Sequence, residues 1–439
     1  MVILNHHDYV NKMSVILNDS TKFLRLGPVD IYDRTVSNEA KFQRNIVKWV
    51  KSGSLSSAVA EIIRPTGSIR PRLYGLPKTH KEGAPLRPIL SMIGSSQHKV
   101  AKWLAQLLDP VLKFCSNHCV KDSFDFARFI RSFPSTDKFM VSFDVCSLFT
   151  CIPILETTDI CTDLLYRSHL SPPDIPESTL IELMKFATTS VEFSFNDIMY
   201  RQIDGVSMGS PLGPTLANIF MGFWEKKIMS DPNRPVVYFR YVDDTFCLFN
   251  GEDEAEAFFL SLNNLHPALQ FTLEKEKDKV LSFLDVSVCR LPLGFFTTVY
   301  RKPTFTGLYT RWDSFCPTKR KINLIKTLTH RALMICSDSK LDEEIKFISA
   351  TLCNNGFPLD IVKSVIHHKI ADFNKIKPAM VEKCPVYLRL PWLGDISDSF
   401  SRQISRSVQD CYYSSNLRVV FKTKPILVPN GKDVLPPPP

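Results

Sequence analysis

The spacing of apolar residues along the chain predicts a mixture of amphipathic helices and short strands. In NEAKFQRNIVKWVKS, Phe42, Ile46 and Trp49 recur at helical spacing, so residues 1–60 should be largely helical. The following stretch, to about residue 95, is rich in Gly and Pro and favours short strands and a hairpin.

Helical and strand patterns then alternate. SSQHKVAKWLAQLLDPVLKF predicts an amphipathic helix that is capped by Ser95 or Ser96 and ends near Pro110. KFMVSFDV predicts a strand that enters a turn, and Pro176 should open the helix of PESTLIELMKFATTS. EFSFNDIMYRQI has the pattern of a hairpin, and the loop GVSMGSPLGP should become a helix from about Pro214.

The second half of the chain continues this mixture. FRYVDDTFCLF, residues 239–249, predicts a strand, followed by a helix over 252–265 and two strands within 269–289. GFFTTVYRKP favours a strand pair, and the chain should turn helical from about residue 313. Residues 385–425 read as mixed structure before the low-complexity end GKDVLPPPP, and the whole pattern is that of an α+β protein.

Composition is that of a globular protein without a membrane partner. The 439 residues are 44% hydrophobic and 23% charged, and no apolar run approaches the roughly 20 residues that cross a bilayer. The start, MVILNHHDYVNKM, lacks the basic and apolar regions of a signal peptide. Twelve cysteines without a regular framework suit reduced thiols, so we expect an intracellular protein of the nucleus or cytoplasm.

The formal charge of +9 permits a polyanionic partner. RPTGSIRPRLYGLPKTHKEGAPLRP holds seven basic residues against one acid, Glu82, and VYRKPTFTGLYTRW and CPTKRKINLIK add cations among Tyr and Trp. Cations interleaved with aromatics suit phosphate contact and base stacking. A solvated basic face is the alternative for either patch.

Three carboxylates occur at the ends of apolar strands. Asp243 and Asp244 lie in FRYVDDTFCLF, and Asp144, 99 residues earlier, ends the apolar strand of MVSFDVCSLFT. At the tips of adjacent strands they would repel one another unless divalent cations neutralised them. Two bridged Mg²⁺ ions are the machinery of in-line phosphoryl transfer, so metal binding would explain why the chain keeps these charges.

The order of three segments resembles reverse transcriptases. SFDVCSLFT, GVSMGSPLGPTLANIF and FRYVDDTFCLF look like motifs A, B and C of that family. LYGLPKTHKEGAPLRPILS, FLDVSVCR and TTVYRKPTFTGLYTRWDS resemble the Penelope-like retroelement polymerases, relatives of telomerase. The resemblance runs from near Met1 to KDVLPPPP.

This resemblance implies an α+β right-hand polymerase fold with palm, fingers and a helical thumb. FLDVSVCR and GFFTTVYRKP suggest a primer-grip hairpin, and residues from about 296 to 358 resemble a helix-turn-helix-like thumb region. The expected division is an N-terminal helical segment over 1–60, fingers and palm over 61–290, primer grip and thumb over 291–375, a mixed C-terminal extension over 376–430 and a disordered tail over 431–439.

The resemblance also implies site residues. Asp144 and Asp243 would be the principal ligands of two Mg²⁺ ions, with Mn²⁺ as a substitute, while Asp244 would support them and the Val145 carbonyl could contribute. The implied nucleotide-binding residues comprise two fingers lysines as alternatives, an arginine for the triphosphate, an aromatic that blocks a ribose 2′-OH, and the loop and helix of motif B: Lys78, Lys81, Arg87, Phe149, Gly209, Pro211, Pro214 and Asn218.

Two positions depart from the family pattern. Met208 stands where many reverse transcriptases have Gln, as it often does in Penelope-like sequences, and Cys151 replaces an expected Asn. Lys275 and Lys279 are candidates for the proton donor to pyrophosphate, although a solvated face is the commoner place for such lysines.

The implied function is magnesium-dependent synthesis of DNA from an RNA template, a DNA primer and deoxynucleoside triphosphates. Nothing in the sequence resembles the GIY-YIG endonuclease of many family members, so a separate endonuclease or a host nick would have to supply the primer end. Two alternatives stay open: a non-catalytic nucleic-acid-binding remnant, and a template-independent palm-fold nucleotidyltransferase.

Overall fold

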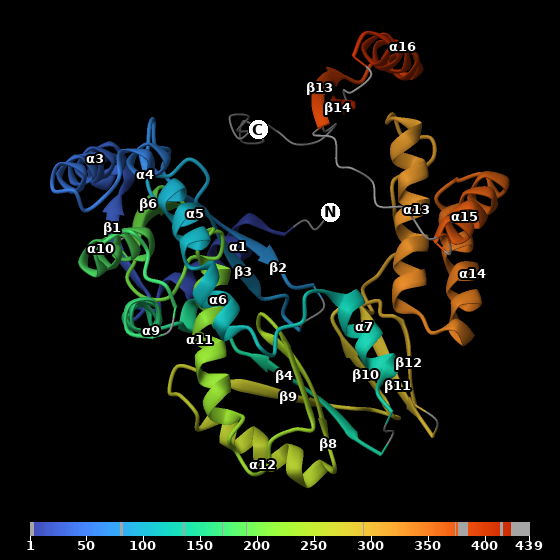
Figure 1. Ribbon diagram of the computed structural model, residues 1–439, viewed down its shortest axis with the longest axis horizontal. Coiled ribbons are helices and arrows are strands. Elements are labelled where there is room, and N and C mark those ends of the chain that lie inside the picture. Colours follow the sequence, from blue (N-terminus) through green and yellow to red (C-terminus); the bar gives the residue numbers. More distant parts are fainter. Residues whose placement is uncertain are drawn as a thin grey trace. The chain divides into compact units, whose positions relative to one another are not determined.

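The computed structural model describes residues 4–79, 82–134, 137–168, 170–189, 191–292, 294–373, 375, 385–412 and 416–422. The chain forms two compact units: Met1–Phe296 with Tyr300–Thr304, and Thr297–Val299 with Phe305–Pro439 (Figure 1). Within the described ranges, no helix combines the length and the apolar character that crossing a bilayer requires.

The first unit contains a five-stranded sheet, which is called the fingers sheet below. Its order is β1-β6-β5-β2-β3, with bounds β1 (Phe23–Pro28), β2 (Arg72–Pro77), β3 (Leu86–Ser91), β5 (Val191–Phe195) and β6 (Ile198–Gln202). The hairpins β2–β3 and β5–β6 confirm two sequence predictions.

The N-terminal segment is only partly helical. Its helices are α1 (His6–Leu17), α2 (Val29–Tyr32), α3 (Thr35–Lys51) and α4 (Ser57–Ile63). The helical spacing of Phe42, Ile46 and Trp49 is confirmed, since all three are buried on α3. The prediction of helix is wrong for Phe23–Pro28, because this segment pairs with β6 and its Phe23 ring packs edge-on against Phe193. Such pairing between distant segments overrides local periodicity.

The first unit also holds a four-stranded antiparallel sheet, the palm. Its order is β7-β8-β4-β9, with β4 (Phe139–Val145), β7 (Val237–Tyr241), β8 (Asp244–Phe249) and β9 (Phe271–Lys275). FRYVDDTFCLF is therefore a hairpin with Val242 and Asp243 at its turn, and the prediction of one continuous strand is wrong.

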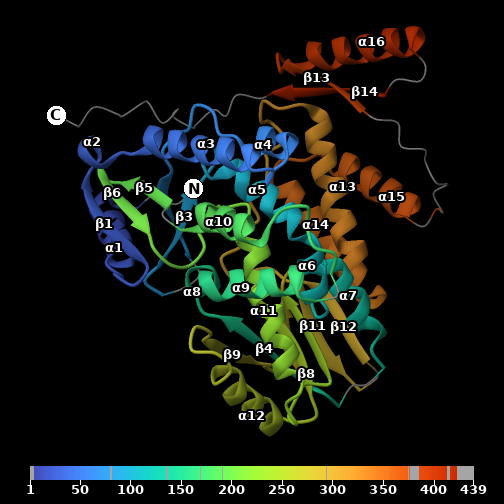
Figure 2. The same ribbon diagram turned by 60° about the vertical axis from the view of Figure 1, so that its left-hand side comes forward.

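Helices cover one face of the palm sheet. On β4, Val141, Phe143 and Val145 enter a core that they share with helices of the same unit, namely α5 (His98–Leu107), α6 (Asp109–Cys115), α9 (Ile154–Tyr166), α10 (Glu177–Thr188), α11 (Gly213–Ile228) and α12 (Glu252–Asn263). Figures 1 and 2 both show α12 beside β8 and β9.

The expected helix over SSQHKVAKWLAQLLDPVLKF is divided. The N-cap of α5 is Gln97 rather than Ser95 or Ser96, and no side chain caps it. Helix α5 ends at Leu107, near Pro110 as expected, and Pro110 lies in the first turn of α6. Because the first turn of a helix needs no backbone donor at that position, proline is accommodated there.

The opposite side of the palm sheet carries a three-stranded sheet and a helix, α7 (Ser123–Ser132). The sequence did not predict this helix. The sheet order is β10-β11-β12, with β10 (Val280–Phe283), β11 (Val286–Leu291) and β12 (Gly294–Val299). Two strands were expected in 269–289, whereas three begin there, β9, β10 and β11. A pair of strands was expected in GFFTTVYRKP, whereas this segment forms the single strand β12. Phe126 of α7 packs on Phe246 and Phe283.

The second unit begins with three helices around their own core. These are α13 (Thr318–Ile335), α14 (Asp338–Asn354) and α15 (Leu359–Phe373), and Ile325, Ile348 and Val362 are among their buried residues. The mixed extension follows as β13 (Pro385–Pro391), α16 (Asp395–Cys411) and β14 (Asn416–Lys422), whose two strands pair in parallel. The predicted tail over 431–439 lies outside the described residues.

Candidate active site

The palm strands bring the three predicted carboxylates together. Asp144 on β4 stands directly opposite Asp244 on β8 in the antiparallel ladder. The Val145 amide donates a hydrogen bond of 3.1 Å to the carbonyl of Asp243, which fixes the hairpin turn beside the end of β4. Since alternate residues of a strand face opposite sides, Asp144 lies on the side of the sheet away from Phe143 and the helical core.

The turn that carries Asp243 has an uncommon backbone. Val242 has a φ of +60°, in the left-handed region. A β-branched residue is disfavoured there and costs about 1–3 kcal/mol, so surrounding contacts must hold it. The turn therefore stores strain next to the carboxylates.

A cavity of about 650 Å³ opens beside these carboxylates. Asp144 and Asp244 form part of its wall, together with Ser142. Lys302, which belongs to one of the basic stretches of the sequence, also lines it. The cavity is thus lined both by carboxylates and by the side chain of a lysine.

Electrostatics show that the carboxylates act on one another. Burial, and after it the nearby charges of Asp243 and Asp144, raise the pKa of Asp244 to about 6, while Lys302 and Arg87 oppose the shift. A carboxyl group whose ionised form is disfavoured by two others suits a site for a cation. Arg87, on β3 of the fingers, lies close enough to take part in this balance.

The donor set suits a hard divalent cation, although the side chains do not form a closed cage. In the described portion of the chain, no three His, Cys, Asp or Glu residues are grouped closely enough to hold one metal ion together. Carboxylate oxygens are the ligands that Mg²⁺ and Mn²⁺ prefer, and mutual repulsion keeps such groups apart without a cation. The raised pKa of Asp244 is the observation that favours cation binding here.

The loop of motif B packs on the fingers. Gly209 has a φ of +131°, and a Cβ there would lie 2.1 Å from the Leu90 carbonyl oxygen. The Leu90 amide donates to the Met208 carbonyl at 2.8 Å, which joins this loop to β3. The close approach that requires glycine is thus to the strand that carries Arg87.

The other predicted nucleotide-binding residues have varied surroundings. Phe149 is half-buried against the main core of the first unit. Pro211 is half-buried in the loop before α11, and the Lys78 amide donates to Pro85 at 2.9 Å. Lys81 lies outside the described residues.

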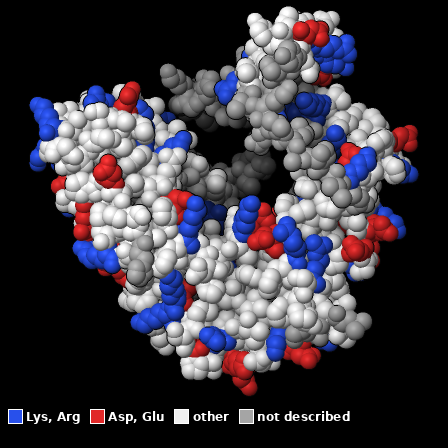
Figure 3. All heavy atoms as spheres, viewed as in Figure 1, with Lys and Arg blue, Asp and Glu red and all other residues white. Residues whose placement is uncertain are grey.

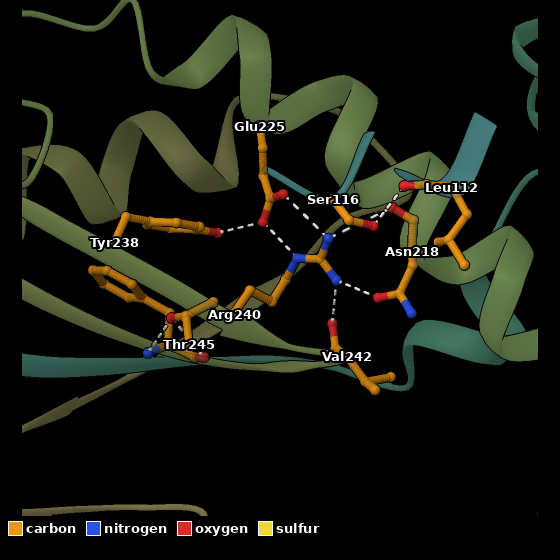
Figure 4. Close-up of polar contacts among 9 residues, drawn as sticks. Leu112, Ser116, Asn218, Glu225, Tyr238, Arg240, Val242 and Thr245 are labelled. Atoms are coloured by element: carbon orange, nitrogen blue, oxygen red, sulfur yellow. Dashed lines mark hydrogen bonds and ion pairs between the residues drawn. The ribbon is translucent and has the colours of Figure 1, made fainter. Parts of the chain in front are cut away.

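Asn218 is already engaged by a residue that the sequence reading did not single out. The Asn218 side-chain oxygen accepts a 2.6 Å hydrogen bond from Nη1 of Arg240 on β7. The Arg240 guanidinium is fully buried and binds both carboxylate oxygens of Glu225 on α11, at 2.5 and 3.1 Å. Tyr238 donates to the same carboxylate at 3.0 Å (Figure 4).

Arg240 stays charged in this environment. Burial by itself would lower the pKa of the guanidinium, but the Glu225 carboxylate raises that pKa by more, and the net shift is upward. The sequence signal was an arginine inside an apolar strand, which calls for a buried partner. Identifying that partner as Glu225 requires the packing of α11 on the sheet.

Lys275, a candidate proton donor, is held by α12. Its ammonium group pairs with Glu252 at 2.7 Å and with Glu256 at 2.5 Å. Hydrogen bonds to these two carboxylates raise the pKa of Lys275. These pairs give the lysine a structural place on the edge of the palm.

Two family models match the sequence. A model described as reverse transcriptase (RNA-dependent DNA polymerase) matches residues 79–323, more than half of the chain. A model described as animal helix-turn-helix domain matches residues 308–367, which overlap the predicted thumb region. No curated protein gives a match in sequence.

Several solved structures are similar to the chain at low identity. A telomerase from Candida albicans in complex with a fragment of telomeric RNA has a TM-score of 0.45 at 11% identity, over 76% of this chain and 69% of that one. An apo telomerase from Candida tropicalis has a TM-score of 0.44 at 12% identity, over 78% of this chain and 63% of that one. The Sicinivirus 3Dpol RNA-dependent RNA polymerase has a TM-score of 0.44 at 13% identity, over 72% and 71%.

Proposed function

Because this chain belongs to the reverse transcriptase (RNA-dependent DNA polymerase) family, we propose that it extends a DNA primer along an RNA template as the polymerase of a Penelope-like retroelement. The observation that carries the proposal is the juxtaposition of Asp144 with Asp244, next to the turn of Asp243. The ordered motifs and the helix-turn-helix match at 308–367 support the narrower assignment.

The carboxylates would hold the metal ions. Asp144 and Asp243 are the proposed principal ligands, and Asp244 supports them. The Val145 carbonyl lies next to Asp144, at the end of β4. Two bound divalent cations, Mg²⁺ or Mn²⁺, would lower the pKa of the attacking hydroxyl group and neutralise charge on the phosphates. The raised pKa of Asp244 fits this role, because bound cations would offset the cost of burying its charge and the repulsion from Asp243 and Asp144.

The fingers would bind the incoming nucleotide. Arg87 offers paired donors to phosphate oxygens, and Lys78 or Lys81 offers a mobile point charge. The electrostatic influence of Arg87 on Asp244 supports this placement. Phe149 would exclude a ribose 2′-OH by its bulk. Gly209 and Pro211, with Asn218 on α11, would shape the nucleotide site.

The proposed partners are an RNA template, a DNA primer and deoxynucleoside triphosphates. A nick made by a separate endonuclease or by the host would supply the primer end. Lys302, exposed at the edge of the cavity beside Asp244, would contact a phosphate of one of these partners.

Primer extension by the purified protein tests the proposal. With an RNA template, a DNA primer, deoxynucleotides and Mg²⁺, we expect products whose sequence follows the template. Asp144→Asn and Asp243→Asn should each lower extension by at least about 1,000-fold, because each loses a ligand that the reaction needs. Both variants should fold and bind template nearly as the wild type does.

Three results would contradict the assignment. Extension by either variant at a rate near that of the wild type would remove the carboxylates from the chemistry. Products independent of the template would favour a nucleotidyltransferase, and template binding without any extension would favour the non-catalytic remnant.

A further inference from the structure

The Arg240 guanidinium joins two parts of the palm, helix α11 and the turn that precedes Asp243. Two of its nitrogens bind the Glu225 carboxylate, and Nη1 donates both to the Asn218 side chain and, at 3.1 Å, to the carbonyl oxygen of Val242. Figure 4 shows the guanidinium between Glu225 and Asn218, with the Val242 carbonyl on its other side. One buried side chain thus links α11 to the turn before Asp243.

The contact with Val242 falls at the strained position. Val242 has a positive φ, and its carbonyl belongs to the peptide that leads directly into Asp243. A donor fixed on that carbonyl favours one orientation of the peptide and therefore one direction for the Asp243 backbone. Asp243 in turn accepts the amide of Val145, beside Asp144.

The backbone of Arg240 is itself fixed. Its amide donates to the His118 carbonyl at 2.9 Å, and its carbonyl accepts from the Val120 amide at 3.0 Å. The guanidinium is therefore anchored through the strand and through Glu225, which is only 3% exposed. A buried ion pair adds little net stability over apolar residues of similar size, so stability alone does not account for this one.

We propose that Arg240 is a positioning residue, which holds the Val242–Asp243 turn in the conformation that presents Asp243 to a divalent cation beside Asp144. The inference rests on the proposed function for the identity of the cation site. It assigns Asn218 a share in this positioning, because its side-chain oxygen directs the same Nη1 that contacts Val242.

Arg240→Lys is the primary test. Lysine keeps the positive charge beside Glu225, but its single nitrogen cannot also reach Asn218 and Val242. We expect Mn²⁺ affinity, measured by titration of the protein without nucleic acid, to fall by about 10- to 100-fold, the usual effect of removing a group that orients a ligand. The kcat for deoxynucleotide incorporation should fall, while the affinity for template stays within about twofold of the wild type.

Tyr238→Phe is the matched control. It removes a hydrogen bond from the same buried network, but Tyr238 contacts Glu225 and not the turn. Thermal stability should fall, while Mn²⁺ affinity should stay within about twofold of the wild type. If Tyr238→Phe weakened Mn²⁺ binding as much as Arg240→Lys, the network would be merely structural and the proposal would be wrong.

A third variant covers the case in which Arg240→Lys does not fold. The combination Arg240→Met, Glu225→Met and Tyr238→Phe replaces the buried ion pair with apolar groups, a change that proteins often tolerate without loss of stability. We expect a folded protein with weakened Mn²⁺ binding. Wild-type Mn²⁺ affinity in this variant or in Arg240→Lys would overturn the proposal.

Hydrogen exchange gives a readout that needs no metal. The Val145 amide, which donates to Asp243, should exchange about tenfold faster in Arg240→Lys than in the wild type and at an unchanged rate in Tyr238→Phe. Unchanged exchange in Arg240→Lys would contradict the proposal. If these shifts occur in a protein that does not extend primers, the proposed function fails while the positioning role stands.

Discussion

Asp244 carries a charge that the fold disfavours. Burial and the neighbouring Asp243 and Asp144 raise its pKa from 3.8 to about 6. Between these two values the folded protein retains a proton that the unfolded chain releases. In the absence of divalent cations, stability should therefore fall as the pH rises from about 4 to 6 and stay low above that window.

Asp244→Asn should remove this penalty. At pH 7.5 with a chelator, we expect the variant to be more stable than the wild type by on the order of 1–3 kcal/mol, and near pH 3.5 the difference should vanish. Thermal unfolding at the two pH values provides the measurement. Millimolar Mg²⁺ should reverse the order at pH 7.5, and a variant less stable than the wild type with chelator present would contradict the argument.

At the scale of single residues, the sequence predicted the three carboxylates but not the buried arginine beside their turn. Asp144, Asp243 and Asp244 stand out because charge interrupts apolar strands, and strand pairing then places them together. Arg240 interrupts its strand in the same way, but its role depends on contacts with α11 and with a turn whose positive φ no residue type signals, because valine avoids that region.

Helix α11 connects several parts of the palm, and its packing depends on Gly222. A Cβ at this position would lie 2.0 Å from the Cys115 carbonyl oxygen at the end of α6. That atom belongs to the backbone, so it cannot move aside as the end of a flexible side chain can. The two helices approach this closely only because residue 222 lacks a side chain.

Gly222→Ala should therefore destabilise the protein. The added methyl group must separate α11 from α6, and we expect a loss of about 1–3 kcal/mol, measured by denaturant unfolding. Alanine favours helix over glycine by up to about 1 kcal/mol, so the steric cost exceeds the measured net loss by about that amount. Equal or greater stability in the variant would show that the helices separate without cost.

Local sequence patterns predicted those elements whose stabilising contacts are local or are made with a single core. Helix α3 and the β2–β3 hairpin formed as expected, since their apolar spacing and turn residues agree with their burial. The strand β1 did not, because its stability comes from pairing with β6 about 175 residues later. The parallel pairing of β13 with β14 was likewise not visible in the local pattern.

Charge is distributed unevenly over the whole molecule. The face drawn in Figure 3 mixes Lys and Arg with Asp and Glu. A groove of about 630 Å³ beside α3 and α10 differs from this mixed face in its balance of paired and unpaired charges. Its acids are engaged, Glu182 by the Trp49 indole and Glu192 by Arg201, whereas Lys41, Lys48 and Lys185 have no ion-pair partner in the described residues.

This groove should contribute to the affinity for nucleic acid. Lys41 and Lys48 are seven residues apart on α3, about 10 Å along the helix, a spacing that suits separate phosphates of one strand. We expect Lys41→Glu with Lys48→Glu to weaken binding of single-stranded RNA by at least about tenfold at 0.1 M salt and to flatten the salt dependence.

A control on the same helix isolates the groove from the general charge. Arg44→Glu with Lys51→Glu changes the net charge equally, also at a spacing of seven, but neither residue lines the groove. This pair should weaken binding by less than about threefold. Equal losses in the two double variants would show a diffuse field rather than contact in the groove.

The position of β4 within the palm has a consequence for synthesis of the chain. Both neighbours of this strand, β8 and β9, come about 100 residues or more after it in the sequence. On the ribosome, β4 must therefore emerge with two open edges and an apolar face, and it waits several seconds at ordinary translation rates before either partner exists. Nascent chains arrested before residue 244 should consequently depend on chaperones and aggregate when these are depleted, whereas chains that have released β9 should not.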